Sequence, residues 1–466
     1  MYEAKRWSDM KGFFGEDVFL SGEVAKKLYD LVKDMPIIDY HCHLSPKEIY
    51  ENKRFEDIGS LWLNGDHYKW RLMRTGGIDE EYITGKASND EKFLAFAKVL
   101  PLAPGNPVYH WAHMELKTYF GINEPLNEDS AADILMEANS LLQQRGITPQ
   151  SLMKSSNVES VCTTDDPADS LEYHLAIMKK PFGVDVRPSF RPDKAVGGIM
   201  QPFFPEYVKG LVKGDISFSE WLDVITERID FFYSTGCRIS DLSLSQIPVT
   251  LGSYNQAKEA FDKAMATQPD KALESDYISF MVRFLAGKYT ERNIVMQLHL
   301  SALRNNSSSL FKRLGPDCGN DSVGSSLDIN CFGRLLSKIE SESGLPKLIV
   351  YTLNPSNYYE IATMLGCFQA STEGNVQFGA AWWFCDHIDG ILDQMKVLSA
   401  TGLLGKFNGM LTDSRSFTSY ARHDFFRRIL CSFVGEMVSK GEYDLSAAQK
   451  LVSAVSYDNA KKYFKI

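Results

Sequence analysis

The chain has 466 residues, of which 44% are hydrophobic and 24% charged, and its 50 basic and 60 acidic side chains give a formal net charge of −10. This composition is typical of a folded globular protein and excludes a disordered or fibrous one. The acidic balance also argues against a nucleic-acid partner, because binding to a phosphate backbone requires a basic surface.

Eight short apolar segments, several of them ending in polar residues, predict the strands of a parallel sheet. Segments long enough for a helix separate them, and such strand–helix alternation favours an α/β fold. In chain order the predicted strands are 36–43, 157–164, 184–190, 236–241, 293–300, 347–353, 375–383 and 407–413. Eight such units predict a (β/α)8 barrel of the TIM type, with an open doubly wound sheet as the alternative.

Residues 44–156, between the first two predicted strands, break this rhythm. Helical patterns at 90–100 and 129–144 predict a large, mainly helical insertion after strand 1, over one end of the barrel. The turn-rich stretch 315–326 predicts a mobile loop after the fifth strand. The predicted regions are therefore an N-terminal helical segment with the first strand (1–43), the insertion (44–156), the rest of the barrel (157–430), and C-terminal helices that are a candidate homo-oligomer contact (431–466).

The sequence also predicts where the protein is located. No apolar stretch approaches the roughly 18 residues of a membrane helix, and the N-terminus lacks the apolar core of a signal peptide. The eight cysteines form no CxxC pair, which favours reduced and mostly buried thiols. We therefore expect a cytoplasmic protein without a membrane partner.

Polar side chains stand at the ends of three predicted strands, where barrel enzymes place their functional residues. His41 and His43 are two residues apart, so both imidazoles point to the same side of the first strand. His299 lies near the end of the fifth strand, and Asp413 ends the eighth. Each has a structural explanation, as a polar strand end, a rim histidine or a helix cap. Their coincidence at one rim favours a divalent metal site with positions open for water or substrate.

Six segments carry motifs of a known family. They are DHYKWRLMR (66–74), NPVYHWAHMEL (106–116), PSFRPDK (188–194), MQLHLSALRNN (296–306), AAWWFCDH (380–387) and LTDSRSFTSYARHDFFRRIL (411–430). Together they resemble the uronate (glucuronate) isomerase family of the amidohydrolase superfamily, over nearly the whole chain. The resemblance implies an aldose–ketose isomerase of sugar-acid catabolism. Its reaction interconverts D-glucuronate with D-fructuronate, and D-galacturonate with D-tagaturonate, by proton transfer between C2 and C1 through an enediol.

The resemblance also implies roles for particular residues. One divalent metal would be held by His41, His43 and Asp413, with zinc as the first expectation and manganese, nickel or iron as alternatives. The predicted catalytic residues are Asp413, Tyr68 and His67. The predicted substrate contacts are Arg191, Arg415, His299, Trp382 and Asp241. In our hypothesis the metal and Asp413 help to open the sugar ring, while Tyr68 and His67 handle proton movement.

The substrate contacts have physical support. An acidic protein needs local positive charge to hold a sugar acid, and Arg191 and Arg415 can clamp its oxygens, although rim salt bridges would also explain them. Neighbours on a strand point to opposite faces, so only one of the two adjacent tryptophans is expected to reach the site, and we favour Trp382. Asp241 ends the fourth predicted strand, where the superfamily usually has a lysine or glutamate that bridges to a second metal, which suggests one metal. The sequence departs from the family pattern after Asp241, and at Cys385, where asparagine is expected.

Other interpretations remain open at this level. His110 and His113 share one face of a predicted helix, where packing is favoured over a metal site. A metal-dependent hydrolase or decarboxylase could use the same fold, because fold and metal do not fix the reaction. The two arginines and the 66–70 segment count against it. A non-catalytic sugar-acid binding protein would keep Arg191 and Arg415 but would not need His41, His43 and Asp413.

Overall fold

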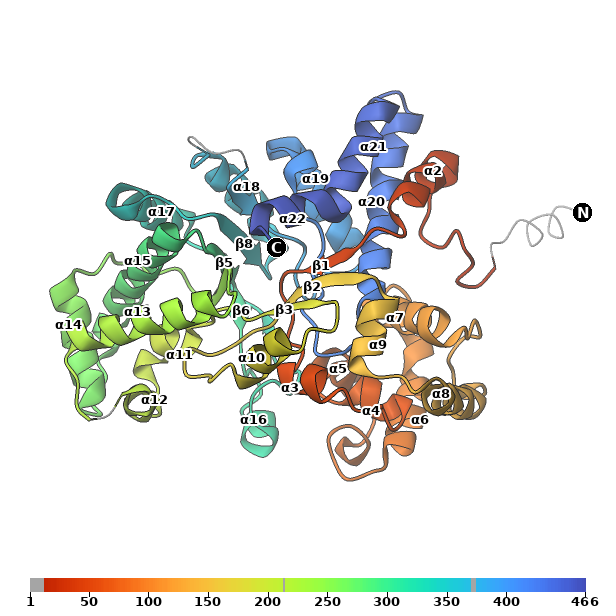
Figure 1. Ribbon diagram of the computed structural model, residues 1–466, viewed down its shortest axis with the longest axis horizontal. Coiled ribbons are helices and arrows are strands. Elements are labelled where there is room, and N and C mark those ends of the chain that lie inside the picture. The colour runs from red at the N-terminus through yellow and green to blue at the C-terminus, as the bar shows by residue number, and fades with distance from the viewer. Residues whose placement is uncertain (1–11, 213, 370–373) are drawn as a thin grey trace, which may run out of the picture.

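The protein is an α/β structure with two parallel sheets at its centre and helices around them (Figure 1). The computed structural model describes residues 12–212, 214–369 and 374–466. The first sheet has the order β1 (Ile37–Asp39), β2 (Val158–Cys162), β3 (Asp185–Arg187). The second has the order β4 (Ile239–Leu244), β5 (Val295–Leu300), β8 (Leu348–Thr352), β9 (Val376–Phe378). All pairs within the two sheets are parallel, which confirms the predicted α/β class.

One residue joins the two sheets. Phe190, just beyond β3, forms parallel bridges with Asp165 and with Ser240 of β4. Its N–H donates to the Ile239 carbonyl at 3.1 Å, and its own carbonyl accepts from the Asp241 N–H at 3.0 Å. Within the described residues, Phe190 is therefore the one residue whose backbone pairing connects the β3 side of the first sheet with β4 of the second.

The segment that follows β9 in the predicted order lies along the free edge of β1. The Asp413 N–H donates to the His41 carbonyl at 3.1 Å, and the His43 N–H donates to the Ser414 carbonyl at 2.9 Å. The prediction of a regular strand over 407–413 is nevertheless wrong. Gly409 and Asp413 have φ values of 75° and 45°, in the left-handed region, which interrupts the extended geometry of a strand.

Other predicted strands differ from the structure mainly at their ends. The predictions 36–43 and 375–383 run past β1 and β9, because their last residues leave the sheets to line a cavity. The prediction 184–190 runs past β3 to Phe190, which pairs with both sheets. The prediction 236–241 began and ended too early. Asp241 lies within β4 rather than at its end.

Helices occupy most of the chain between β1 and β2, at the lower right of Figure 1. They are α3 (Pro46–Glu51), α4 (Ile58–Leu63), α5 (His67–Thr75), α6 (Asn89–Val99), α7 (Pro107–Glu115), α8 (Ala131–Arg145) and α9 (Pro149–Ser155). Ser88 and Glu91 form a capping box that starts α6, close to the predicted boundary. Helix α8 starts two residues later than predicted, because the Asn127 side chain accepts from the N–H groups of Asp129 and Ser130 in a turn.

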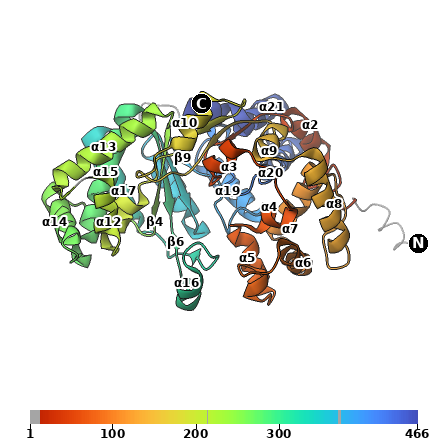
Figure 2. The ribbon, with the colours of Figure 1, turned by 60° about the horizontal axis from the view of Figure 1, so that its bottom comes forward.

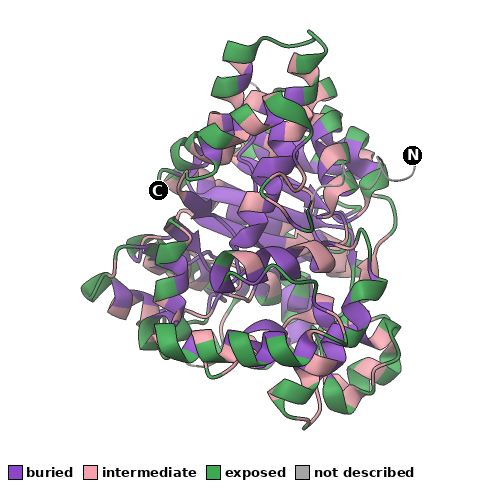
Figure 3. Cartoon of the chain, turned by 90° about the vertical axis from the view of Figure 1, so that its right-hand side faces the viewer, coloured by how far each residue is buried: buried purple, intermediate pink, exposed green. Residues whose placement is uncertain are grey.

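The remaining helices cover the outside of the sheets. They are α2 (Gly22–Val32), α10 (Glu172–Lys179), α11 (Asp193–Val196), α12 (Phe204–Leu211), α13 (Phe218–Ser234), α14 (Tyr254–Met265), α15 (Glu274–Arg292), α16 (Ser308–Leu314), α17 (Ile329–Ser343), α18 (Tyr358–Gly366), α19 (Ile388–Thr401), α20 (Ala421–Ser439), α21 (Leu445–Ser453) and α22 (Asn459–Phe464). Figure 3 shows buried strands inside and exposed helix faces outside. None of the helices in the described ranges is long and apolar enough to cross a membrane.

The core consists of two apolar clusters. One packs β1 and β2 against the helices between them and against α2, α20 and α21. The other packs β4, β5 and β8 against α12–α18. The first cluster also contains Ile239 of β4, Val295 of β5 and Tyr351 of β8, so the apolar core continues from one sheet to the other, and the burial of these side chains stabilises the molecule as a whole.

A small hairpin extends from the end of β5. Strand β6 (Ala302–Leu303) pairs antiparallel with β7 (Ser322–Val323), so the stretch 315–326, predicted as a loop, contains a short strand. Figure 2 shows α16 of this hairpin and α5 projecting from the same side of the molecule. Arg71 of α5 donates to the Asp321 carbonyl at 2.7 Å, and Arg74 donates to the Cys318 carbonyl. The hairpin is thereby fastened to the helical segment.

Candidate active site

A cavity of about 570 Å³ lies where the two sheets meet, and most of the predicted site residues line it. These residues are His41, His43, His67, Arg191, His299, Trp382, Asp413 and Arg415. The structure places the other two elsewhere. Asp241 is fully buried behind the cavity wall. Tyr68 lines a second cavity, of about 660 Å³, which shares His67 and Trp383 with the first.

Two imidazoles converge on one carboxylate oxygen. The Nε2 atoms of His41 and His43 lie 3.2 Å and 3.1 Å from Oδ1 of Asp413. Both histidines follow β1 and alternate as on an extended chain, while Asp413 is held beside them by the backbone contact to the His41 carbonyl. The three ligand atoms lie within 4.8 Å of one another, as metal ligands would. The fit is chemical as well, since two imidazoles and a carboxylate suit a divalent metal.

The Asp413 carboxylate is also fixed from the opposite side. The indole Nε1–H of Trp382 donates to Oδ2 of Asp413 at 2.8 Å. Burial opposes ionisation of this carboxyl, but the hydrogen bonds from His41 and His43 outweigh burial and hold the pKa of Asp413 well below its usual range. One carboxylate oxygen therefore faces the histidines and the other faces the cavity wall.

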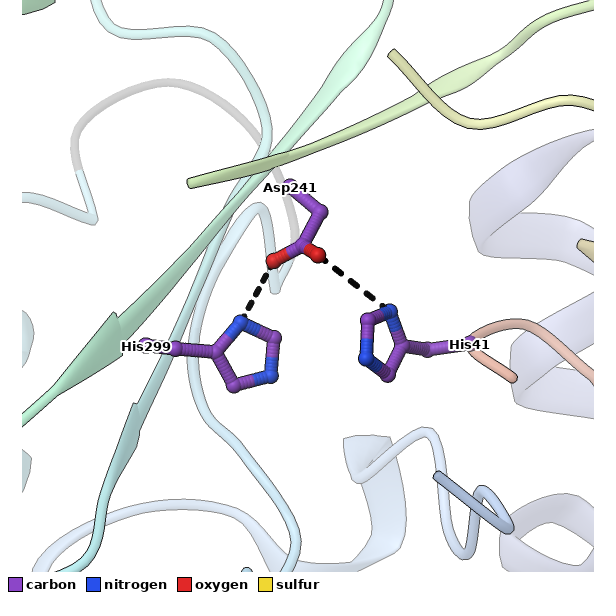
Figure 4. A group of neighbouring side chains, drawn as sticks. All are labelled: His41, Asp241 and His299. Atoms are coloured by element: carbon purple, nitrogen blue, oxygen red, sulfur yellow. Dashed lines mark hydrogen bonds and ion pairs between the residues drawn. The ribbon is translucent and has the colours of Figure 1, made fainter. Parts of the chain in front are cut away.

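A second group of three lies deeper and contains His41, Asp241 and His299 (Figure 4). His299 Nδ1 lies 2.6 Å from Asp241 Oδ1, and His41 Nδ1 lies 3.8 Å from Asp241 Oδ2. Asp241 is on β4, and His299 lies two register positions further along the neighbouring strand β5, so the two side chains emerge on one face. Their burial makes them a fixed base for the cavity.

The environment of Asp241 argues against a metal in this deeper group. The Nη1 atom of Arg191 lies 3.0 Å from Asp241 Oδ2, and a guanidinium at that distance would repel a cation. Burial raises the pKa of Asp241, but Arg191 and then the two histidines outweigh it and hold the pKa far below its usual value. The geometry gives Asp241 the role of orienting His299, because these two side chains are hydrogen bonded at 2.6 Å, whereas His41 lies beyond hydrogen-bond distance of Asp241.

Three guanidinium groups stand among the acidic side chains of the cavity wall. Arg191 pairs with Asp193 at 2.8 Å and with Asp241, while Arg415 lies 3.6 Å from Asp317. A third guanidinium, Arg304 of the β6–β7 hairpin, stands over the Trp383 ring at 5.3 Å. These groups can hold a carboxylate and several hydroxyl groups with directional hydrogen bonds.

The expectation that only one of the two tryptophans reaches the cavity was wrong. Trp382 and Trp383 both line the cavity, because they lie beyond the end of β9 and do not alternate as strand residues. Trp382 contacts Asp413, and Trp383 packs edge-on against His67 with ring centroids 5.5 Å apart. Both tryptophans therefore belong to the site.

His67 and Tyr68 begin helix α5. The side chain of Asp66 caps this helix by accepting from the N–H groups of Tyr68 and Lys69, at 3.0 Å and 3.1 Å. The two rings are stacked, with centroids 5.2 Å apart and an interplanar angle of 14°. The cap thus fixes the place where the helical segment meets the cavity.

With this geometry in place, comparisons with known proteins become informative. The family model for glucuronate isomerase matches residues 10–464. A uronate isomerase from Caldicellulosiruptor saccharolyticus is 50% identical, covering 98% of this chain and all of that protein. The chain belongs to the glucuronate isomerase family. This membership confirms the sequence-based prediction of a uronate isomerase.

Solved structures of the family agree with this one. The crystal structure of uronate isomerase from Thermotoga maritima superposes with a TM-score of 0.92 at 38% identity, covering 97% of this chain and 100% of that chain. The crystal structure of glucuronate isomerase from Caulobacter crescentus gives a TM-score of 0.90 at 25% identity, with 97% of each chain covered. The fold of this chain is therefore shared with these two structures over 97% of its length.

Within this glucuronate isomerase site, sequence reasoning missed several residues. They are Thr164, Asp165, Asp166, Asp169, Asp193, Lys194, Ser243, Arg304, Asp317 and Trp383 on the first cavity, and Asp386 on the second. Asp193 had a usable signal, because it stands two residues after Arg191. Arg304 also had a signal, since it lies in the motif 296–306, whereas Asp317 had none and reaches the cavity only through the fold of the hairpin.

Proposed function

We propose that the protein interconverts D-glucuronate with D-fructuronate, and D-galacturonate with D-tagaturonate, through an enediol. The observation that carries this proposal is the pairing of a metal-type ligand set with three guanidinium groups on the wall of one cavity. A hydrolase would use the ligand set but would have no need of several cations arranged for a sugar acid. A catalytic role for Tyr68 also fits, because Tyr68 lines the second cavity, which shares His67 with the first.

We propose further that the two sheets form a (β/α)8 barrel. The neighbour order supports this, because the segment 408–414 lies beside β1, followed by β2, β3, β4, β5, β8 and β9. In this description 44–156 is a helical insertion, 157–430 completes the barrel, and 431–466 forms C-terminal helices. The functional side chains would then gather at the carboxyl ends of the strands.

We propose one divalent metal at His41, His43 and Asp413, with zinc before manganese, nickel or iron. When bound, such a metal supplies a Lewis acid that polarises substrate oxygens. The chain's own residues do the rest of the work. Arg191 and Arg415 hold carboxylate and hydroxyl oxygens, and His299 is positioned by its contact with Asp241.

The proton transfers need a group that alternates between donor and acceptor. We assign this to Tyr68, with His67 orienting its ring and Asp413 managing a hydroxyl proton during ring opening. The two tryptophans and the hairpin limit access of water to the enediol, which protects it from side reactions.

Proton NMR in heavy water tests the proposal directly. Purified protein loaded with zinc is incubated with D-glucuronate and, separately, with D-galacturonate. We expect the corresponding ketose to appear, with solvent deuterium exchanging at C1 or C2. A matched Asp413→Asn variant should show no turnover. If the metal-loaded protein left both sugars unchanged, the substrate assignment would be wrong.

Location and assembly stay predictions. The cysteines are all free, and seven of the eight are buried, which fits the expected cytoplasmic location. A homo-oligomer through residues 431–466 is tested by measuring the mass in solution by light scattering.

A further inference from the structure

A buried carboxyl group behind Tyr68 has no part in the function proposed above. Asp386, in the turn after β9, is only 6% exposed, and its Oδ2 accepts a hydrogen bond from the Tyr68 hydroxyl at 2.7 Å. Its other oxygen, Oδ1, has no hydrogen-bond partner within the part of the chain that the structure describes. A buried acceptor without a partner is costly, so its presence calls for a reason.

The backbone around Asp386 is built to hold it there. Phe384 has a φ of 67°, a strained value for a large side chain, and the Cys385 N–H donates to the Trp382 carbonyl at 2.8 Å. A Cβ on Gly390 would lie 2.0 Å from the Cys385 carbonyl oxygen, so only glycine lets α19 close on this turn. The turn thereby places Trp383 on both cavities and Asp386 on the second only.

Tyr68 lies at the boundary between the two cavities. Tyr68 lines the second cavity, and its ring is stacked on His67, which lines both cavities. The hydroxyl hydrogen points to Asp386, which leaves the oxygen lone pairs free to accept a proton from a substrate hydroxyl.

The surroundings of Asp386 allow both protonation states. Burial raises the pKa of Asp386 to about 7, although the charge of Arg422 and the Tyr68 hydrogen bond act in the opposite direction. The groups that act on it or line the cavity with it are Tyr68, His67 and Arg71 of α5, Arg422 of α20, Asp413, Tyr358 of α18, Cys385, His387 and Asp389. Arg422 donates to the Thr412 carbonyl at 2.9 Å and is stacked on Trp111, so its charge is fixed in place.

We propose that Asp386 is a positioning residue that accepts the proton of Tyr68 during the isomerisation. The inference rests on the proposed role of Tyr68. A substrate hydroxyl gives its proton to the Tyr68 oxygen while the proton of Tyr68 moves to Oδ2 of Asp386. The substrate oxygen is left as an alkoxide, Tyr68 stays neutral, and Asp386 becomes a carboxylic acid. Reversal of the two transfers returns the proton to a substrate oxygen.

A double-mutant cycle tests this relay. Asp386→Asn keeps the size and an accepting oxygen but cannot take up a proton, so we expect kcat to fall about 100-fold with KM nearly unchanged. The limb of the kcat–pH profile that reports a group near neutral pH should disappear. In a Tyr68→Phe background the same change should cost nothing more, because the partner of Asp386 is already gone.

The outcomes separate the proposals. Asp393→Asn, a carboxylate-to-amide change on the exposed face of α19, is the control and should keep the wild-type kcat. If Tyr68→Phe turned over normally, the roles of Tyr68 and Asp386 would both be overturned. If Tyr68→Phe lost activity but Asp386→Asn did not, or if the two losses were additive, only the relay would be overturned.

Discussion

At the scale of single residues, Asp413 links the metal-type ligands to the cavity wall. It receives contacts from His41 and His43 on one oxygen and from Trp382 on the other. Its positive φ turns the chain back at this point, and aspartate is among the few non-glycine residues that tolerate this conformation. The position thus needs both the carboxylate and the backbone preference of aspartate.

The indole hydrogen bond to Asp413 can be removed without losing the aromatic wall. For Trp382→Phe we expect kcat to fall about tenfold to 100-fold, since a hydrogen bond to a charged group contributes about 1.5–3 kcal/mol. Steady-state kinetics and metal content by atomic emission measure the effect. Trp221→Phe is the control, because it also loses an indole hydrogen bond, to Tyr277, but in the second core cluster. Equal kcat in wild type and Trp382→Phe would show that this contact does not orient Asp413.

Single residues at strand ends were predictable when their chemistry and place were both visible in the sequence. His41, His43, His299 and Asp413 meet at the cavity as expected. The positions of side chains in turns, such as that of Asp386, were not predictable, because they depend on backbone dihedral angles that residue types do not reveal.

At the scale of elements, helix α7 shows how packing decides between two interpretations of a histidine pair. His113 is buried with both ring nitrogens paired, Nδ1 with the Tyr109 carbonyl at 2.7 Å and Nε2 with the Leu126 N–H at 3.0 Å. Phe13 and Phe14 pack against its ring. Packing is therefore the correct interpretation for His113, and it requires the neutral imidazole.

This requirement predicts a dependence of stability on pH. Burial lowers the pKa of His113 from its ordinary value of 6.5 to about 4. Between these values the unfolded chain binds the proton and the folded chain does not, so stability falls as the pH is lowered. The loss at pH 5 is about 2 kcal/mol. Urea unfolding of the wild type and of His113→Gln at pH 7 and pH 5 measures this dependence. The free energy of unfolding should fall less in His113→Gln than in the wild type when the pH is lowered. An equal fall in both proteins would contradict the neutral state of His113 in the folded protein.

Strand positions were predictable where the sequence is apolar on both faces. The predictions over 293–300 and 347–353 match β5 and β8 within two residues, because fully buried parallel strands read as continuous apolar runs. The break of the predicted strand 407–413 was not predictable from its own residues. The left-handed conformations of Gly409 and Asp413 arise from contacts with β1 and with Val455, far apart in sequence.

At the scale of the whole molecule, the chain forms two parallel sheets, and the cavity lies where they meet. The α/β class and the order of strands followed from the sequence, but this division did not, because it depends on which helices cover which strands. The backbone pairing between the two sheets runs through Phe190, while His41 and His43 pair the first sheet with the segment 408–414.

Hydrogen exchange tests the division. We expect the amides of Phe190, Asp241, His43 and Asp413 to exchange faster than those within β5, which is paired on both sides. A bound metal and a uronate should slow exchange at His43 and Asp413, because both residues then become part of a bound complex. Equal protection of all these amides without ligand would show that the molecule opens as one unit.

The fastening of the β6–β7 hairpin has a consequence for protein engineering. Arg71 and Arg74 grip the carbonyl oxygens of Asp321 and Cys318, and Gly319 fits against the His67 carbonyl, where a Cβ would be 2.9 Å away. These contacts between α5 and the hairpin involve main-chain atoms and one glycine, so they do not depend on the side chain of Asp317. Asp317, which faces the cavity, can accordingly be substituted to shift the preference among sugar acids, while the hairpin stays attached to α5.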